Sequence, residues 1–216
     1  AGKGSVALDL KSDSAQVEVQ RLLATADIYL ENLGPGVVER PGLDYESVAK
    51  RKPDIVYCSV SGYGRTGPDA DRRAYDTVIQ AESGIMSLTG APGKPTKIGV
   101  SAADLIGPTF ACVGILAAIH YRTREGIGQR IDASMFDACV WMTQSVWPAA
   151  ESGESVEALG NGHPLYAPYG VFAARDDQIF IGIETDTQWT NLCKIIGIPP
   201  NSDLETNWDR VRQRTY

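Results

Sequence analysis

Hydrophobic and polar residues alternate along the chain in blocks that predict strands and helices in turn. Short apolar runs rich in β-branched residues predict four strands, at residues 5–10, 27–30, 54–60 and 129–134. Stretches with helical periodicity predict helices that begin at Ser14 and that span residues 44–50, 109–123 and 135–146. This alternation is typical of an α/β fold, here a mostly parallel, Rossmann-like sheet with flanking helices and right-handed crossovers.

The pattern changes after Trp147. Residues 151–168 are polar and contain glycines, so we expect a linker or an active-site loop there. Two short runs in the following segment predict a hairpin, and a helix over residues 187–196 ends at Gly197. We therefore expect a large α/β domain over residues 1–150, lacking its N-terminal segment, and the incomplete start of a smaller α+β domain over residues 169–216.

Composition excludes several classes of function. The 216 residues carry a net charge of −7, which argues against a nucleic-acid or anionic-membrane surface, and the longest apolar run, residues 110–119, is shorter than a bilayer span. The four cysteines are far apart in sequence and lie in apolar surroundings, so we expect buried, reduced thiols. They favour a reducing compartment: the cytoplasm, or an organellar matrix if an N-terminal segment precedes the chain. With two histidines, we expect neither a histidine-based triad nor a metal site.

Asp104 is the first candidate for chemistry. It stands between a short apolar strand signal and the helix predicted over residues 109–123. Ser101 and Asp104 also fit a capping box, but a helix that began at Ser101 would contain Pro108, whose ring would clash with the carbonyl of Asp104. We therefore expect the helix to begin at Pro108 and Asp104 to lie in the preceding loop. An ionised carboxylate near a helix N-terminus fits a nucleophile and a structural residue equally well.

Two further patterns concern bound ligands. Residues 62–67, Gly-Tyr-Gly-Arg-Thr-Gly, match the dinucleotide fingerprint, but a polar stretch without helical periodicity follows, so we interpret the match as accidental. Four basic residues follow predicted strand ends or turns, where α/β folds bind phosphorylated ligands: Lys11, Arg40, Arg72 and Arg73. Each alone is typical of a solvated surface, whereas together they indicate a phosphate-bearing ligand.

Several stretches recur together, and in this order, in one family. They are residues 5–11, 31–40 and 59–64, then Tyr75-Asp76 with Gln80 and Ser83-Gly84, and Arg122 with residues 128–132. The chain resembles the class III CoA-transferases, the family of formyl-CoA transferase and the carnitine CoA-transferases, over nearly its whole length. The resemblance implies an interlocked homodimer, acyl-CoA and a small carboxylic acid as substrates, and no tightly bound cofactor.

The resemblance also implies roles for particular residues. Asp104 matches the catalytic aspartate, which forms a mixed anhydride with the acyl group and then an aspartyl-CoA thioester. Because each step develops an oxyanion, we expect backbone N–H donors near Asp104. Asp76 matches an often acidic position beside the active site, and Gly160 and Gly162 fall in a loop that closes over it. The positions that match CoA-binding residues are Leu8, Lys11, Asn32, Leu33, Gly34, Arg40, Arg72, Arg73, Ala74 and Tyr75.

Two sequence differences bear on the reaction. The loop Gly160-Asn161-Gly162-His163 departs from the glycine run of formyl-CoA transferase, which favours larger di- or hydroxy-carboxylates over formyl or oxalyl groups. The related α-methylacyl-CoA racemases carry a histidine where this chain has Tyr75, and racemisation needs both an acid and a base. We therefore favour a transferase over a racemase, with a non-catalytic CoA-binding subunit as a third interpretation.

Overall fold

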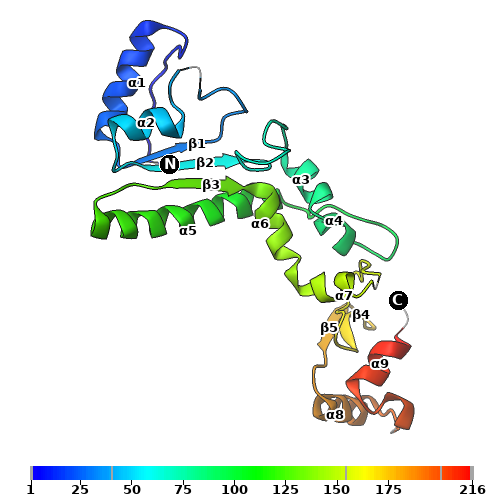
Figure 1. Ribbon diagram of the computed structural model, residues 1–216. Coiled ribbons are helices and arrows are strands. Elements are labelled where there is room, and N and C mark those ends of the chain that lie inside the picture. Colours follow the sequence, from blue (N-terminus) through cyan, green and yellow to red (C-terminus); the bar gives the residue numbers. More distant parts are fainter. Residues whose placement is uncertain (1, 40, 154, 200, 215–216) are drawn as a thin grey trace. The chain divides into compact units, whose positions relative to one another are not determined.

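The structure is a computed structural model that describes residues 2–39, 41–153, 155–199 and 201–214. The chain divides into two compact units, one of residues 1–85 and 98–147 and the other of residues 86–97 and 148–216. Figure 1 labels the helices and strands of both units. The fold is mixed α/β, as the sequence predicts.

A parallel sheet organises the first unit. Its three strands are β1 (Ile28–Glu31), β2 (Val56–Ser61) and β3 (Arg130–Ser134), and β2 lies in the centre. Ile28 is paired with Val56 and Tyr57 with Arg130, so all three strands run in one direction. The predicted strand over residues 5–10 is wrong: it pairs with no described strand, and Val6 is 60% exposed. An apolar run needs a neighbouring strand to satisfy its backbone groups before it forms a stable strand.

Helices cover both faces of this sheet. Figure 1 shows α1 (Asp13–Thr25) and α2 (Tyr45–Arg51) on one side and α5 (Ala102–Glu125) on the other. The first unit also contains α3 (Asp76–Glu82), α6 (Met135–Met142) and the 3₁₀ turn η1 (Gln144–Val146). Two short helices, α4 (Ile85–Leu88) and α7 (Trp147–Glu151), belong to the second unit except for their first residues. β2 is buried on both faces: Cys58 packs in one apolar cluster, and Tyr57 packs in the other and donates a 2.8 Å hydrogen bond to the Leu43 carbonyl.

The helix α5 is longer than the sequence predicts. It begins at Ala102 and contains Pro108, so the predicted start at Pro108 is wrong. Its small residues let it lie close to the sheet, because a Cβ on Gly107 or Gly114 would meet Met135 at 2.8 Å or Ile131 at 3.0 Å. By length and composition α5 is apolar enough to cross a membrane. Its packing against β2, β3 and α6 makes it instead one layer of the α/β unit.

The cysteines form no disulfide among the described residues. Cys58, Cys139 and Cys193 are buried, as expected, but Cys112 on α5 is exposed. Burial raises the pKa of the Cys58 thiol to about 11. That thiol is therefore protonated and unreactive near neutral pH.

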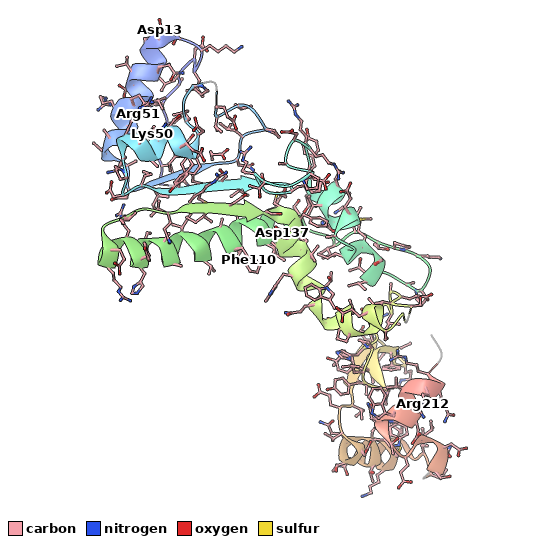
Figure 2. The ribbon with its side chains drawn as sticks, viewed as in Figure 1. Asp13, Lys50, Arg51, Phe110, Asp137 and Arg212 are labelled. Carbon is pink, nitrogen blue, oxygen red and sulfur yellow. The ribbon has the colours of Figure 1, made fainter. Side chains whose placement is uncertain are left out.

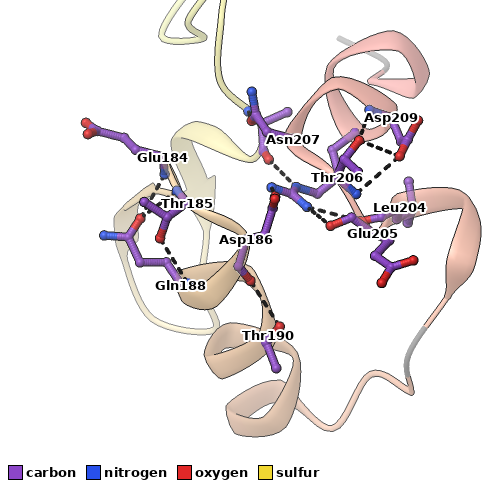
Figure 3. Close-up of polar contacts among 12 residues, drawn as sticks. Glu184, Thr185, Asp186, Gln188, Thr190, Leu204, Glu205, Thr206, Asn207 and Asp209 are labelled. Atoms are coloured by element: carbon purple, nitrogen blue, oxygen red, sulfur yellow. Dashed lines mark hydrogen bonds and ion pairs between the residues drawn. The ribbon is translucent and has the colours of Figure 1, made fainter.

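The second unit contains the predicted hairpin and helix. β4 (Tyr169–Ala173) and β5 (Gln178–Gly182) are antiparallel, and α8 (Asp186–Ile196), the 3₁₀ turn η2 (Ser202–Leu204) and α9 (Asn207–Gln213) follow. Arg210 is 4% exposed and ties these parts together. It donates hydrogen bonds to the carbonyls of Leu204 and Glu205 and pairs with Asp186 at 2.8 Å. Figure 3 labels these three partners.

Gly128, in the loop before β3, packs closely against the backbone of Ile55. A Cβ there would lie 1.9 Å from the Ile55 carbonyl oxygen, so one of the two backbone segments would have to shift. We expect Gly128→Ala to lower the free energy of unfolding by roughly 1–3 kcal/mol or more. Gly99→Ala is the matched control, because nothing lies within 4 Å of its Cβ position. Urea denaturation of both variants measures the difference, and equal stability would contradict the close approach.

Candidate functional site

The candidate nucleophile lies at the beginning of α5. Asp104 occupies the first turn, and its side chain is exposed. In the part of the chain that the structure describes, its carboxylate has no hydrogen-bond or ion-pair partner. The neighbouring Ala103 is fully buried in the core, so the backbone at this point is anchored while the carboxylate faces solvent. An accessible carboxylate on an anchored backbone suits a nucleophile.

A residue from another helix caps α5. Ser101 is the N-cap residue, but its side chain makes no capping hydrogen bond, so the capping box considered from the sequence is absent. Asp76 at the start of α3 supplies the cap instead. Its Oδ1 accepts hydrogen bonds from the amides of Ala103 at 2.8 Å and Asp104 at 3.4 Å. The acidic residue that the family resemblance placed beside the site therefore contacts the backbone of the candidate nucleophile.

Gln80 continues this contact one turn further along α3. Its buried side chain donates from Nε2 to Asp76 Oδ2 at 2.7 Å and to the Val100 carbonyl at 3.3 Å. Its Oε1 accepts from the Ile98 amide at 2.9 Å. Asp76 and Gln80 together therefore hold the segment from Ile98 to Asp104 at several backbone points.

These bonds restrict where an oxyanion can be stabilised. The amides of Ala103 and Asp104 donate to Asp76, that of Ala102 donates to the Val100 carbonyl, and that of Leu105 donates to the Ser101 carbonyl. The first four amides of α5 are thus already hydrogen-bonded. The backbone donors expected near Asp104 must therefore come from a segment other than residues 102–105.

A second polar cluster lies where β1 ends. Glu31 is 5% exposed and pairs with Arg65, whose Nη2 lies 2.7 Å from a carboxylate oxygen of Glu31. The same Nη2 donates to the Leu33 carbonyl at 2.8 Å, and Glu31 also accepts from the Leu33 amide. Asn32 donates to the Val60 carbonyl at 2.7 Å. The turn that contains Asn32, Leu33 and Gly34 is therefore fixed at the carboxyl edge of the sheet, the edge at which α/β folds bind ligands.

Arg65 was missed by the sequence reasoning. It belongs to the glycine-rich stretch over residues 62–67. Turns rather than a helix follow this stretch, which agrees with the interpretation of its match to the dinucleotide fingerprint as accidental. The stretch turns sharply to bring the Arg65 amide to Asp132 Oδ2 at 2.8 Å and the Arg65 side chain to Glu31. The available signal was Glu31 itself, an acid at the end of an apolar strand, which needs a cation when buried.

The segment from Arg72 to Tyr75 leads into α3. Arg72 pairs with Asp69 and Glu82 and lies over the Tyr63 ring, whereas Tyr75 is 80% exposed just before Asp76. The hydrogen bond from Tyr63, together with Arg72, holds the pKa of Glu82 below its usual value. Arg72 therefore has two carboxylate partners, while Arg73 is exposed and Ala74 packs against the core.

The other predicted site residues are dispersed. Leu8 is half-buried and Lys11 is exposed, both before α1, and Arg40 lies outside the described residues. Gly160 and Gly162 belong to the second unit, where the Gly160 amide donates to the Gly90 carbonyl at 2.8 Å. Gly162 and the rings of His163 and Tyr169, whose centroids lie 5.0 Å apart, line a pocket of about 330 Å³ in that unit.

Another cavity of about 340 Å³ lies beside α5, β3 and α6. Figure 2 labels two of the residues that line it, Phe110 on α5 and Asp137 on α6, and Trp141 meets the Phe110 ring edge-on at 5.3 Å. None of the predicted site residues that the structure describes lines this cavity. The candidate site is therefore centred on the first turn of α5.

Comparison with known proteins decides the family. The model of CoA-transferase family III matches residues 1–215. The chain belongs to this family. Acetyl-CoA:oxalate CoA-transferase from Acetobacter aceti is 42% identical over 203 residues, which cover 92% of this chain and 52% of that protein. Succinate–glutarate CoA-transferase from Agrobacterium fabrum is 38% identical and covers 99% of this chain and 54% of its own length.

Solved structures agree with this assignment. A CAIB/BAIF family protein from Brucella suis matches with a TM-score of 0.82 at 37% identity, over 99% of this chain and 58% of that one. Rv3272 from Mycobacterium tuberculosis matches with a TM-score of 0.86 at 27% identity, over 98% of this chain and 57% of that one. This member of CoA-transferase family III spans about half the length of the curated relatives that it matches.

The pair of Glu31 and Arg65 allows a direct test of how the β1 turn is held. We expect Arg65→Met to lower the free energy of unfolding by about 3–5 kcal/mol, because it leaves a buried carboxylate unpaired. Arg21→Met is the control: it breaks an exposed pair with Glu18 and is expected to leave the free energy of unfolding nearly unchanged, because solvent screens such a pair. Denaturant unfolding measures both variants. Similar losses in the two would show that the buried pair does not hold the turn.

Proposed function

We propose that the protein transfers CoA from an acyl-CoA to a carboxylic acid through a covalent intermediate on Asp104. The observation that carries the proposal is the exposed carboxylate of Asp104, which has no partner among the described residues and lies on a backbone held by Asp76. Membership of CoA-transferase family III supports it. Covalent catalysis splits one difficult exchange into several easier steps.

In the first half-reaction, an oxygen of Asp104 attacks the thioester carbonyl of the donor and the carbon–sulfur bond breaks. The products are a mixed anhydride and CoA thiolate. The thiolate then attacks the side-chain carbonyl carbon of Asp104, which releases the donor acid and leaves an aspartyl-CoA thioester. The acceptor carboxylate reverses these steps, so that the acceptor leaves as its CoA thioester and the Asp104 carboxylate is regenerated.

For the acceptor we propose a small di- or hydroxy-dicarboxylate. The named relatives act on oxalate, glutarate, mesaconate and citramalate, all of which carry two carboxylates. One of these acids is oxalate, so the departure of residues 160–163 from a glycine run does not by itself argue against a two-carbon acid.

The remaining assignments are also part of the proposal. CoA would contact the turn of Asn32, Leu33 and Gly34 and the segment that ends at Tyr75. The protein would act as a homodimer, hold no resident cofactor, and work in a reducing compartment such as the cytoplasm. The buried, protonated thiol of Cys58 is compatible with such a compartment.

Mass spectrometry of the full-length protein tests the covalent step. After incubation with succinyl-CoA and brief borohydride treatment, we expect a mass change on the peptide that contains Asp104. We expect Asp104→Ala to abolish this change and to lower the transfer rate roughly 10³-fold or more, because the nucleophile is lost. Asp137→Asn is the matched control, since Asp137 occupies the first turn of α6 as Asp104 does that of α5.

The other outcomes identify the alternatives. A normal transfer rate in Asp104→Ala would disprove the proposal. Exchange of the α-proton with solvent deuterium and no adduct would indicate a racemase. Binding of CoA with neither signal would indicate a non-catalytic subunit.

A further inference from the structure

The backbone of Asp104 lacks one of the supports that a helical residue normally has. In an α-helix the carbonyl of residue 104 accepts a hydrogen bond from the amide of residue 108, but Pro108 has no N–H to donate. The amide of Asp104 is one of the four at a helix N-terminus that have no partner within the helix. The carbonyl of this residue therefore lacks its usual donor at position 108 and its amide has no acceptor within the helix, so contacts from outside α5 can stabilise the turn.

Asp76 supplies the external contact. One of its carboxylate oxygens accepts from the amides of Ala103 and Asp104, and the other accepts from Gln80. The side chain of Asp104 makes no bond of its own within the described chain, so its direction follows from the backbone that Asp76 holds. A shift of this turn would move the reacting oxygens by a similar distance.

Gln80 determines which group is needed at position 76. Its Oε1 is committed to the Ile98 amide, so its Nε2 donor faces Asp76. The side chain at position 76 must then accept hydrogen bonds with both of its terminal atoms. A carboxylate does so, whereas the amide of an asparagine would turn an NH₂ group toward the NH₂ group of Gln80.

We propose that Asp76 and Gln80 are positioning residues that set the reactive geometry of Asp104 without touching the substrate. This inference rests on the proposed function of Asp104. Misplacement of a reacting group by about 1 Å is enough to lower a rate about 100-fold.

The first test is Asp76→Asn in the full-length protein. We expect kcat for CoA transfer from succinyl-CoA to glutarate to fall about 10- to 100-fold, while KM for succinyl-CoA changes less than about threefold. Hydrogen exchange should accelerate in the peptide over residues 98–104, because its backbone amides lose hydrogen-bond partners or are held in poorer hydrogen-bond geometry. A residue that only supported folding would lower the melting temperature without this selective loss of kcat.

The second test is rescue by a complementary change. In the double variant Asp76→Asn with Gln80→Glu, the new amide donates to the new carboxylate, and the second carboxylate oxygen accepts from the Ile98 amide. One acid and one amide remain in the cluster, with their places exchanged. The hydrogen bond from Gln80 to the Val100 carbonyl is lost in this variant, so we expect kcat and the slow exchange of residues 98–104 to recover in part. Failure of both to recover, in a double variant with a normal melting temperature, would overturn the proposal.

Asp44→Asn serves as the matched control. Asp44 caps α2 by accepting from the Ser47 amide at 2.9 Å, which is the same kind of contact on another helix. We expect it to leave kcat and the exchange of residues 98–104 unchanged. If it lowered kcat as much as Asp76→Asn does, the effect would be one of general stability and the proposal would be wrong.

Two further results separate this inference from the proposed function. If Asp76→Asn does not fold, Asp76→Ser replaces it, since serine suits the start of α3 but is too short to span both partners. Wild-type kinetics and exchange in the folded variant would overturn the positioning role and leave the proposed function intact. If the wild-type protein forms no adduct on Asp104, the proposed function fails, and hydrogen exchange then still tests whether Asp76 holds the turn.

Discussion

The missing N–H of Pro108 is the constraint on which the candidate site depends. It removes one internal hydrogen bond from the first turn of α5, where the Asp104 carboxylate is held, so contacts from another element stabilise this turn. Asp76 and Gln80 of α3 provide that support through the Ala103 and Asp104 amides and the segment before them. The position of Asp104 is thus set by tertiary contacts with α3, although the residue lies within a helix.

The sheet explains why the two polar clusters share one edge. α5 runs back along the strands, and its Gly107 packs on Met135, the residue that follows the end of β3. The N-terminus of α5 therefore lies at the carboxyl edge of the sheet, where the Glu31–Arg65 pair also fixes the turn after β1. The fixed turn after β1 and the exposed carboxylate of Asp104 therefore lie at the same edge of the sheet.

Sequence patterns predicted the parts of this arrangement that depend on local periodicity. The three paired strands, the body of α5 and the hairpin of β4 and β5 followed from runs of apolar residues. The start of α5 was not predicted. The expectation that proline begins a helix considers only neighbouring residues, whereas the residue that caps α5, Asp76, lies 28 residues earlier in the chain. Residues 5–10 have the composition of a strand but pair with no described strand. Arg65 matters because it pairs with Glu31, a buried acid at the end of β1. Long-range partners of this kind leave no periodic signal.

The capped turn also has a consequence for how charge is stabilised during transfer. In the proposed reaction the oxyanion forms in some steps on the acyl group and in others on the side-chain carbon of Asp104 itself. A donor fixed to the α5 backbone would suit one of these positions and would compete with Asp76 for the same amides. With the first four amides of α5 already bonded, the helix is specialised to hold the nucleophile. Stabilisation of the oxyanion then falls to a segment that faces Asp104 across the substrate.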